Sequence, residues 1–342
     1  MTRPGEGSAP PPGLCYVSGR TLPTGRSNDR DRLTSASDID AAVQALEAGR
    51  LILLPTETVY GLGCDAGDAR AVAGVFAAKG RPQFNPLIAH VTGLEAASRI
   101  ARLDARTARL AEAFWPGPLT VVAPVLDSDA VCDLARAGLD TVAVRAPDHP
   151  VAQAVLAAFG GPISAPSANR SGRPSPTTFA DAVEETGAAA AARLDGGPCR
   201  VGLESTVVGV FDDALVLLRP GGVTREQIER VAGPLAAQAG EAVRSPGRLA
   251  RHYAPAAPVR LDAQAPAEGH AFLAFGPAAP PGPLVWNLSP AGDMVEAAGN
   301  LFAFLRAADR AGPAGIDVAP IPHHGLGEAI NDRLRRAAGY VG

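Results

Sequence analysis

The chain has 342 residues, enough for about two domains, and its 46% hydrophobic and 19% charged residues exclude a wholly disordered protein. With 31 Lys and Arg against 35 Asp and Glu, the net charge of −4 disfavours a protein that holds nucleic acid tightly through its own surface. No apolar run reaches the roughly 20 residues of a membrane span, and no apolar stretch follows the N-terminus as in a signal peptide. We therefore expect a cytoplasmic protein with no membrane contact.

The first part of the sequence predicts an α/β domain behind a polar arm. Residues 1–33 are rich in Pro, Gly, Arg, Asp and Ser and predict a disordered N-terminal arm. Ser37 or Asp38 can cap a first helix that closes at Gly49. The segments that follow, up to residue 222, alternate irregularly between strand and helix, which indicates a mixed sheet. The expected strands are 51–54, 87–91, 119–125, 141–144, 162–164, 206–211 and 214–218, and the expected helices are 68–79, 95–114, 149–159 and 177–186.

The remaining sequence predicts a connector and a second domain. Residues 223–258 read as a helix followed by a connector, and from residue 259 the hydrophobic pattern restarts. Expected strands at 271–275, 284–286 and 316–320 alternate with expected helices at 295–309 and 327–338. The region 259–342 is therefore predicted to be a small α/β domain of roughly 85 residues.

Several familiar sites are missing from the sequence. The four cysteines form no C-x-x-C pair and have no histidine cluster beside them, so we expect reduced, mostly buried thiols at Cys15, Cys64, Cys132 and Cys199. There is no P-loop, no G-x-S-x-G elbow and no H-E-x-x-H. The glycines of Gly61-Leu62-Gly63 and Gly67 are spaced one residue too widely for a dinucleotide fingerprint and are interpreted as a tight turn.

Polar stretches instead follow the predicted strands, where ligands of open α/β sheets bind. Lys79 and Arg81 share a loop stiffened by two prolines with Asn85, and this pairing suits a polyphosphate. His90, taken alone, is more typical of a core histidine than of a catalyst. Arg145 ends an apolar strand and needs a partner, which a substrate carboxylate or an internal Asp or Glu would supply equally well.

Three further stretches carry hydroxyl groups or a cation. Thr56 follows a strand and is more typical of a turn than of a site. The loop Ser164–Gly172 can wrap phosphate or ribose oxygens with its small side chains and backbone amides. Ser205 is by default a cap or turn hydroxyl, and Arg219 follows a strand as a candidate second phosphate clamp.

Together these motifs resemble the long form of the threonylcarbamoyl-AMP synthase family, whose catalytic module is a YrdC-like domain. The signature of the family's linker is carried by Arg251-His252-Tyr253-Ala254-Pro255, although Arg248, Leu249 and Ala250 replace the usual Met, basic and aromatic residues. The matching motifs, in order, are P-T-E-T-V-Y-G-L-G at Pro55–Gly63, K-G-R-P and N-P-L-I-x-H within Lys79–His90, W-P-G-P-L-T at Trp115–Thr120, T-V-A-V-R-x-P at Thr141–Pro147, A-P-S-A-N at Ala165–Asn169, E-S-T-V-V at Glu204–Val208 and L-R-P-G at Leu218–Gly221.

The resemblance implies an open twisted mixed sheet with helices over 34–222, a linker over 223–258 that covers the active site, and a smaller Rossmann-like α/β domain over 259–342. It implies a nucleotidyltransferase, L-threonylcarbamoyladenylate synthase, which condenses L-threonine, bicarbonate or CO₂ and ATP into threonylcarbamoyl-AMP and pyrophosphate for threonylcarbamoyladenosine modification of tRNA. Mg²⁺ is expected on the ATP phosphates, without protein ligands. The implied partners are downstream tRNA threonylcarbamoyl-transfer proteins, with at most transient tRNA contact.

The resemblance also implies residue roles. Arg145 takes the carboxylate of threonine, Lys79 and Arg81 are catalytic, and residues 245–255 are expected to form a lid. The expected threonine-binding residues are Thr56, His90, Thr141, Arg145, Ala165 and Ser205. The expected ATP-binding residues are Lys79, Arg81, Asn85, Ser167, Ser175, Arg219 and Tyr253.

Two other functions are alternatives to this one. Carbamoyl transfer, as in hydrogenase-maturation proteins with a related domain, is disfavoured because this chain lacks a Cys-rich segment. An RNA-binding or ribosome-assembly module of the YrdC type is the alternative. The sequence pI near 5.9 and the 5% aromatic content argue against RNA binding by stacking.

Overall fold

The computed structural model describes residues 34–82, 84–236 and 252–340. The expectations for the arm 1–33, for Cys15 and for the linker residues Arg248, Leu249, Ala250 and Arg251 lie outside these ranges, as does most of the expected lid at 245–255.

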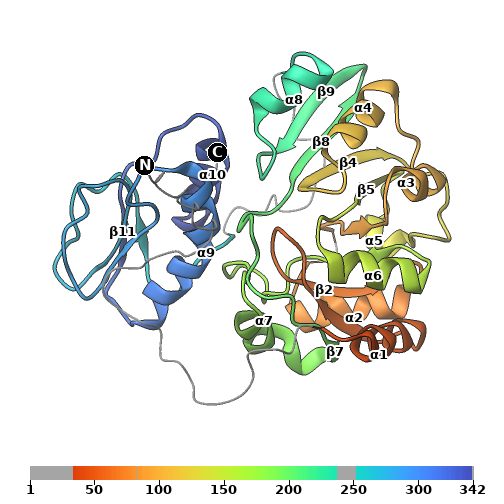
Figure 1. Ribbon diagram of the computed structural model, residues 1–342, viewed down its shortest axis with the longest axis horizontal. Helices are drawn as coiled ribbons and strands as arrows, with labels where there is room; N and C mark the ends of the chain where they lie inside the picture. Colours follow the sequence, from red (N-terminus) through yellow and green to blue (C-terminus); the bar gives the residue numbers. More distant parts are fainter. Residues whose placement is uncertain (1–33, 83, 237–251, 341–342) are drawn as a thin grey trace, which may run out of the picture. The chain divides into compact units, whose positions relative to one another are not determined.

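A nine-stranded mixed sheet is the framework of the first domain (Figure 1). Its strands are β1 (Leu51–Leu54), β2 (Gly61–Asp65), β3 (Ile88–His90), β4 (Leu119–Pro124), β5 (Thr141–Arg145), β6 (Ile163–Ser164), β7 (Ala190–Arg193), β8 (Thr206–Phe211) and β9 (Ala214–Arg219). They lie in the order β7-β1-β2-β6-β3-β5-β4-β8-β9. The pairs β1/β7, β3/β5 and β4/β8 are parallel, and the other five are antiparallel. Because most spatial neighbours are distant in sequence, loops from all over the domain meet at the sheet.

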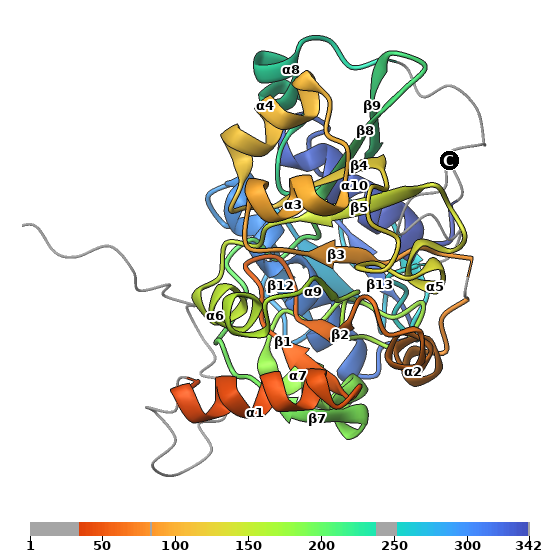
Figure 2. The ribbon, with the colours of Figure 1, turned by 90° about the vertical axis from the view of Figure 1, so that its right-hand side faces the viewer.

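Helices pack around this sheet. They are α1 (Ala36–Glu47), α2 (Ala69–Lys79), α3 (Leu94–Ile100), α4 (Ala105–Phe114), the short α5 (Asp133–Arg136), α6 (Pro150–Phe159), α7 (Phe179–Thr186), the 3₁₀ turn η1 (Gly187–Ala189) and α8 (Arg225–Ala232). Figure 2 shows α1 beside β7 at one end of the sheet and α4 with α8 at the other. Ile228 of α8 is fully buried in the main core of this domain, so the segment that follows residue 222 begins against the sheet domain.

Local hydrogen bonds explain where two helix predictions were wrong. The N-cap of α1 is Ser35 rather than Ser37 or Asp38, because Ser35 and Asp38 form a reciprocal capping box. The helix expected over 95–114 is two helices, α3 and α4. Ala101 takes an extended conformation between them, and the Asp104 carboxylate starts α4 by accepting from the Thr107 N–H at 2.8 Å.

The interpretation of Gly61-Leu62-Gly63 as a tight turn was also wrong, because these residues belong to strand β2. Strand β7 was not predicted from the sequence. A Cβ on Gly63 would lie 3.2 Å from side-chain atoms of both Ile52 and Ile163. Glycine at this position therefore lets the two neighbouring strands β1 and β6 pack closely on β2.

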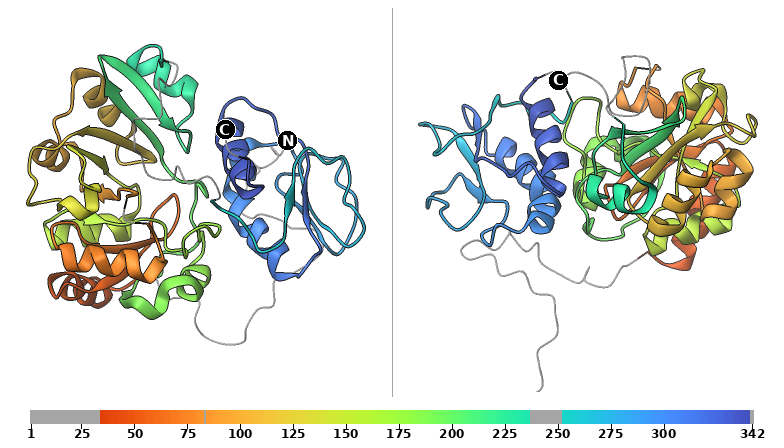
Figure 3. Two further views of the ribbon diagram at one scale, coloured as in Figure 1. Left: turned by 180° about the vertical axis from the view of Figure 1, so that it is seen from behind. Right: turned by 90° about the horizontal axis from the view of Figure 1, so that it is seen from above.

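The second domain is built on a four-stranded sheet that is parallel throughout. Its strands β10 (Val259–Arg260), β11 (Ala271–Ala274), β12 (Val285–Asn287) and β13 (Ile316–Val318) lie in the order β10-β13-β11-β12. Helices α9 (Met294–Arg310) and α10 (Leu326–Ala337) pack on the sheet and lie between it and the first domain (Figures 1 and 3). Their inward faces bury Leu301, Phe302, Leu305, Ile330 and Leu334.

Strand β4 provides a stability test of the first core. Leu119 is 0% exposed, whereas Leu126, just after β4, is 47% exposed. We expect Leu119→Ala to reduce the free energy of unfolding by about 2–5 kcal/mol, because it leaves a cavity between packed layers. Leu126→Ala should change it by less than about 0.5 kcal/mol. Urea unfolding followed by circular dichroism measures both, and equal effects of the two substitutions would contradict the packing described.

Candidate active site

A buried pocket gathers polar groups from strand ends that are far apart in the sequence. Strands β3 and β5 lead into it with His90 and Arg145, β8 is preceded by Ser205, and β9 ends at Arg219. The lining residues are Thr58, Val59, Arg81, Pro86, Leu87, Ile88, His90, Arg145, Ala165, Pro166, Ser167, Glu204, Ser205, Arg219, His252 and Tyr253.

Arg145 is held by protein groups on three sides. Its Nε donates to the Gly117 carbonyl at 3.1 Å and its Nη1 to the Thr58 hydroxyl at 2.8 Å. Its Nη2 lies 2.6 Å from Oε1 of the buried Glu57, an ion-pair distance without hydrogen-bond geometry. Of the two partners left open by the sequence, an internal carboxylate is therefore present. Because the Arg145 guanidinium has five N–H donors and only two hydrogen-bond acceptors in the described protein, donors remain for a ligand.

His90 is a neutral hydrogen-bonding group in this pocket. Burial, together with the nearby Arg145 charge, lowers the pKa of His90 to about 3. Its Nδ1 lies 3.3 Å from the Ile163 carbonyl, so the favoured tautomer donates there and keeps Nε2 as an acceptor. With so low a pKa, His90 suits orientation of a ligand better than proton abstraction.

Ser205 and Arg219 form one polar unit. The Ser205 hydroxyl lies 2.7 Å from the Thr120 hydroxyl. Arg219 Nη2 lies 2.8 Å from the Ser205 carbonyl and 3.2 Å from its hydroxyl. The guanidinium is therefore held in place from one side while Arg219 and Ser205 both line the pocket.

The loop after α2 places a third cation nearby. Arg81 lines the pocket, and its guanidinium donates to the Asn85 and Pro86 carbonyls at 3.4 and 3.2 Å. Burial lowers the pKa of Arg81 to about 10, so it stays charged at neutral pH. The side-chain nitrogen and oxygen of Asn85 are buried and have no hydrogen-bond partner among the described residues. Buried polar groups normally have partners, so Asn85 is fitted to bind a ligand or water.

Lys79 does not line the pocket. Its ammonium donates to the carbonyls of Ser167 and Asn169, and the Ser171 N–H donates to the Lys79 carbonyl at 2.7 Å. Burial, with Arg81 nearby, holds the pKa of Lys79 well below its usual value. The structure thus uses Lys79 to shape the loop 165–171, of which Ala165, Pro166 and Ser167 line the pocket.

Glu204 joins the pocket to the second domain. Its two carboxylate oxygens accept from the Ser175 hydroxyl at 2.6 Å and from Nε of Arg333 at 2.8 Å. Burial alone would raise the pKa of Glu204, but Arg333, Arg219 and the hydrogen bonds outweigh it and lower the pKa to about 2. Ser175 is wholly buried and is not among the lining residues.

The described end of the linker contributes two side chains to the lining of the pocket. His252 and Tyr253 both line it, and burial raises the pKa of Tyr253 to about 12. Tyr253 takes a left-handed conformation with φ of 61° and packs on Phe302 of α9, with 5.3 Å between ring centroids. The neighbouring Ala254 N–H donates to the Gly172 carbonyl at 2.7 Å. The second domain therefore holds Tyr253 in place over the first.

Five of the expected site residues lie outside the lining. Besides Lys79, Asn85 and Ser175, these are Thr56 and Thr141. The Thr56 hydroxyl donates to the Val59 carbonyl at 2.6 Å and so holds the turn that presents Thr58. Thr141 begins β5, four residues and about 13 Å from Arg145. The structure therefore brings Arg81, His90, Arg145, Ala165, Ser167, Ser205, Arg219 and Tyr253 together, and these five only border or support them.

Three polar lining residues were not assigned roles from the sequence: Thr58, Glu204 and His252. Each stands next to, or two positions from, a residue that was assigned one. Thr58 repeats the threonine of the T-E-T motif, and alternation in an extended segment could have shown that Thr56 and Thr58 share a side of the chain. Glu204 and His252 had no signal beyond their positions in the motifs.

Other site types find no support among the described residues. No group of three or more His, Cys, Asp or Glu side chains in these ranges could hold a metal ion. Cys64, Cys132 and Cys199 are free thiols. The helices of the described chain include none that is long and apolar enough to cross a membrane.

The low pKa of Glu204 predicts a pH dependence of stability. Because the pKa is about 2 in the folded protein and about 4.5 for a free glutamate, ionised Glu204 stabilises the fold above pH 4.5 and this contribution is lost as the pH falls towards 2. As the pH falls from 4.5 towards 2, we expect the free energy of unfolding to decrease less for the Glu204→Gln variant than for the unaltered protein. Urea unfolding at several pH values measures the difference. If the free energies of unfolding of the two proteins changed in parallel with pH, the low pKa of Glu204 would be contradicted.

Family models match both halves of the chain. A model described as "Telomere recombination", which groups the Sua5, YciO and YrdC proteins, matches residues 44–221. A model described as "Threonylcarbamoyl-AMP synthase, C-terminal domain" matches residues 223–339.

Curated relatives and a solved structure agree with these matches. Threonylcarbamoyl-AMP synthase of Pyrococcus abyssi is 40% identical to this chain, and the match covers 92% of this chain and 97% of the relative. The Bacillus subtilis enzyme is 39% identical, and the match covers 90% of this chain and 94% of the relative. The crystal structure of P. abyssi Sua5 complexed with L-threonine superimposes with a TM-score of 0.80 at 38% identity, over 88% of this chain and 94% of that one. The expected α/β fold and the resemblance are confirmed, and the chain belongs to the threonylcarbamoyl-AMP synthase family.

Proposed function

We propose that this chain condenses L-threonine, bicarbonate or CO₂ and ATP into threonylcarbamoyl-AMP and pyrophosphate, through the residues of the pocket described above. The observation that carries the proposal is the presence of three arginines, the buried Arg145 and Arg219 and the half-buried Arg81, in one pocket lined with hydroxyl groups. A buried cation needs an anionic partner. A carboxylate and a polyphosphate in one pocket would supply such partners, and threonine and ATP carry these two groups.

The threonine half of the site lies around Arg145. Its remaining N–H donors can bind the substrate carboxylate in a bidentate manner. Neutral His90 can accept a hydrogen bond from the amine or the hydroxyl of threonine, and Thr58 and Ser205 can bind its polar groups. Thr56 acts by holding the turn of Thr58. Thr141 lies too far along β5 to reach the same small molecule as Arg145.

The ATP half lies around Arg81 and Arg219. Both are positive at neutral pH and can neutralise phosphate oxygens, while Ser167 and the backbone of its loop supply further donors. Asn85 offers two unsatisfied polar atoms to the same ligand. Lys79 contributes by holding the Ser167 and Asn169 carbonyls of the loop. Ser175 acts through Glu204 rather than by direct contact.

The reaction needs positioning more than covalent catalysis. The amine of threonine adds to CO₂ to form a carbamate and releases a proton. A carbamate oxygen then attacks the α-phosphorus of ATP, the bond to the β-phosphate oxygen breaks, and pyrophosphate leaves. Arg81 and Arg219 would stabilise the charge that develops on the phosphates. Mg²⁺ would enter on the phosphates of ATP, since the one pocket carboxylate, Glu204, is already bound by Arg333 and Ser175.

The carbamate is the vulnerable intermediate, because carbamates lose CO₂ readily in water. Exclusion of water from the pocket would therefore favour adenylation over decay. His252 and Tyr253 supply a buried wall at the described end of the linker. On this basis we assign His252 and Tyr253, at the described end of the linker, to a lid. The adenylate would then pass to downstream proteins that transfer the threonylcarbamoyl group to tRNA.

Mass spectrometry tests the reaction directly. Purified protein with ATP, Mg²⁺, bicarbonate and L-threonine is expected to yield threonylcarbamoyl-AMP and pyrophosphate, and samples that lack threonine or bicarbonate should yield neither. ATP turnover that does not depend on threonine would overturn the proposal. Tight binding of tRNA in a gel shift without ATP would favour the RNA-binding alternative.

Arg145→Lys tests the threonine half. Lysine keeps the charge beside Glu57 but loses the planar fork, so the KM for threonine should rise at least about tenfold while the KM for ATP changes little. Pyrophosphate release measures both constants. Arg99→Lys is the matched control, because Arg99 is an exposed helical residue that pairs only with exposed Glu95 in the described structure. A similar rise in both KM values would show that Arg145 does not bind threonine selectively.

Tyr253 tests the lid. Tyr253→Ala removes a buried ring from the pocket wall and should raise the KM for ATP and increase futile loss of carbamate, seen as a lower yield of adenylate at limiting bicarbonate. Tyr253→Phe keeps the ring and separates packing from the contribution of the hydroxyl. If Tyr253→Ala leaves ATP affinity and turnover unchanged, the lid assignment fails.

A further inference from the structure

One cation at the catalytic pocket comes from the second domain. Arg333 of α10 is the largest fully buried side chain of the described structure, at 1% exposed. Its Nε donates to Glu204 at 2.8 Å, and its Nη1 donates to Asp332 at 2.6 Å. Its Nη2 is buried without a hydrogen-bond partner among the described residues. A helix of one domain thus places a charge behind Glu204, a carboxylate that lines the pocket of the other.

The contact of Arg333 with Glu204 bears on the phosphate-binding half of the pocket. Glu204 lines the pocket and is followed directly by Ser205, which holds Arg219. An unpaired carboxylate at this position would repel the phosphates that Arg219 is placed to bind. Arg333 offsets that charge and fixes the carboxylate between itself and the Ser175 hydroxyl.

Arg333 also contacts the linker. Its guanidinium carbon lies 5.3 Å from the centroid of the Tyr253 ring, within the range of a cation–π contact. The ring packs on Phe302 on the same side. One arginine therefore touches both a pocket carboxylate and the aromatic side chain that closes the pocket.

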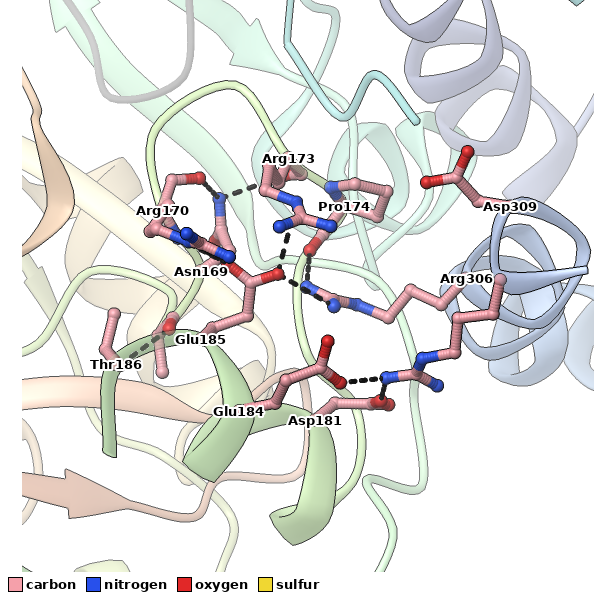
Figure 4. Close-up of polar contacts among 12 residues, drawn as sticks. Asn169, Arg170, Arg173, Pro174, Asp181, Glu184, Glu185, Thr186, Arg306 and Asp309 are labelled. Atoms are coloured by element: carbon pink, nitrogen blue, oxygen red, sulfur yellow. Dashed lines mark hydrogen bonds and ion pairs between the residues drawn. The ribbon is translucent and has the colours of Figure 1, made fainter. Parts of the chain in front are cut away.

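The two domains are joined independently at another place. Figure 4 shows Arg306 of α9 pointing toward Glu185 of α7 and Pro174. Arg306 Nη1 lies 3.1 Å from Oε1 of Glu185, and its Nη2 donates to the Pro174 carbonyl. Arg310, also on α9, pairs with Asp181 and Glu184. Glu185 in turn accepts from the Arg170 N–H at 2.9 Å. This cluster attaches α9 to the first domain without contacting Glu204, so attachment alone does not account for Arg333.

We propose that Arg333 is a positioning residue for ATP, which neutralises Glu204 and orients Tyr253, so that the second domain completes the nucleotide half of the active site. The inference rests on the proposed function. It separates two roles within the second domain. The Arg306 and Arg310 cluster attaches the domain, and Arg333 acts on the substrate through Glu204.

The test compares Arg333→Met with Arg333→Lys and with Arg310→Met in the full chain. Methionine keeps much of the volume but leaves Glu204 uncompensated, so the KM for ATP should rise at least about tenfold with a smaller change in the KM for threonine. Arg333→Lys should recover part of the loss because it restores the charge. Arg310→Met, the control for attachment, should leave both KM values near those of the unaltered enzyme.

A second substitution shows whether the effect passes through Glu204. In the Arg333→Met background, Glu204→Gln removes the uncompensated charge and should lower the KM for ATP again, and Glu204→Gln alone should tighten ATP binding. Isothermal titration with a non-hydrolysable ATP analogue checks binding without turnover. Equal losses in Arg333→Met and Arg310→Met, or no recovery with Glu204→Gln, would overturn the inference. Absence of adenylate formation by the unaltered enzyme would instead overturn the proposed function.

Discussion

A charge buried in a protein must be neutralised, and this constraint governs the whole pocket. Arg145 has Glu57, Glu204 has Arg333, and Glu185 has Arg306. Lys79 and Arg219 have no carboxylate partner in the described structure, because the Lys79 ammonium is bound by two backbone carbonyls and the Arg219 guanidinium by the carbonyl and hydroxyl of Ser205. These pairs leave some arginine N–H donors of the pocket without a protein acceptor, and such donors select for anionic ligands.

The sheet topology is what brings these charges together. The ends of β3 and β5 lie side by side because the two strands pair in parallel, with His90 opposite Arg145 in the register. Ser205 and Arg219 approach each other because β8 and β9 form an antiparallel pair. Glycine in β2 allows the close strand packing that keeps the neighbouring loop 165–167 against the pocket. A site of this kind tolerates little change in strand order.

The second domain does more than extend the chain. Helix α9 brings Arg306 and Arg310 to α7 of the first domain, and α10 brings Arg333 to Glu204. Phe302 and Arg333 also fix Tyr253 in a left-handed backbone conformation that a tyrosine rarely adopts. Such a conformation persists only where the surroundings hold it, which is consistent with a residue placed for function.

The fold class, most strands and helices, the family and eight of the residues that line the pocket could be predicted from the sequence, because hydrophobic periodicity is local and each motif lies within a few residues of a strand end. Which of the predicted site residues line the pocket depends on the tertiary structure. Lys79 donates to a backbone carbonyl, Thr56 donates within its own turn, and Ser175 donates to Glu204. A buried polar group needs a hydrogen-bond partner, and packing rather than the neighbouring sequence determines which partner is near. Arg333 shows the limit most clearly. Its position in the last turns of a helix is explained by the helix dipole, and nothing local reveals that it lies against a carboxylate 129 residues away.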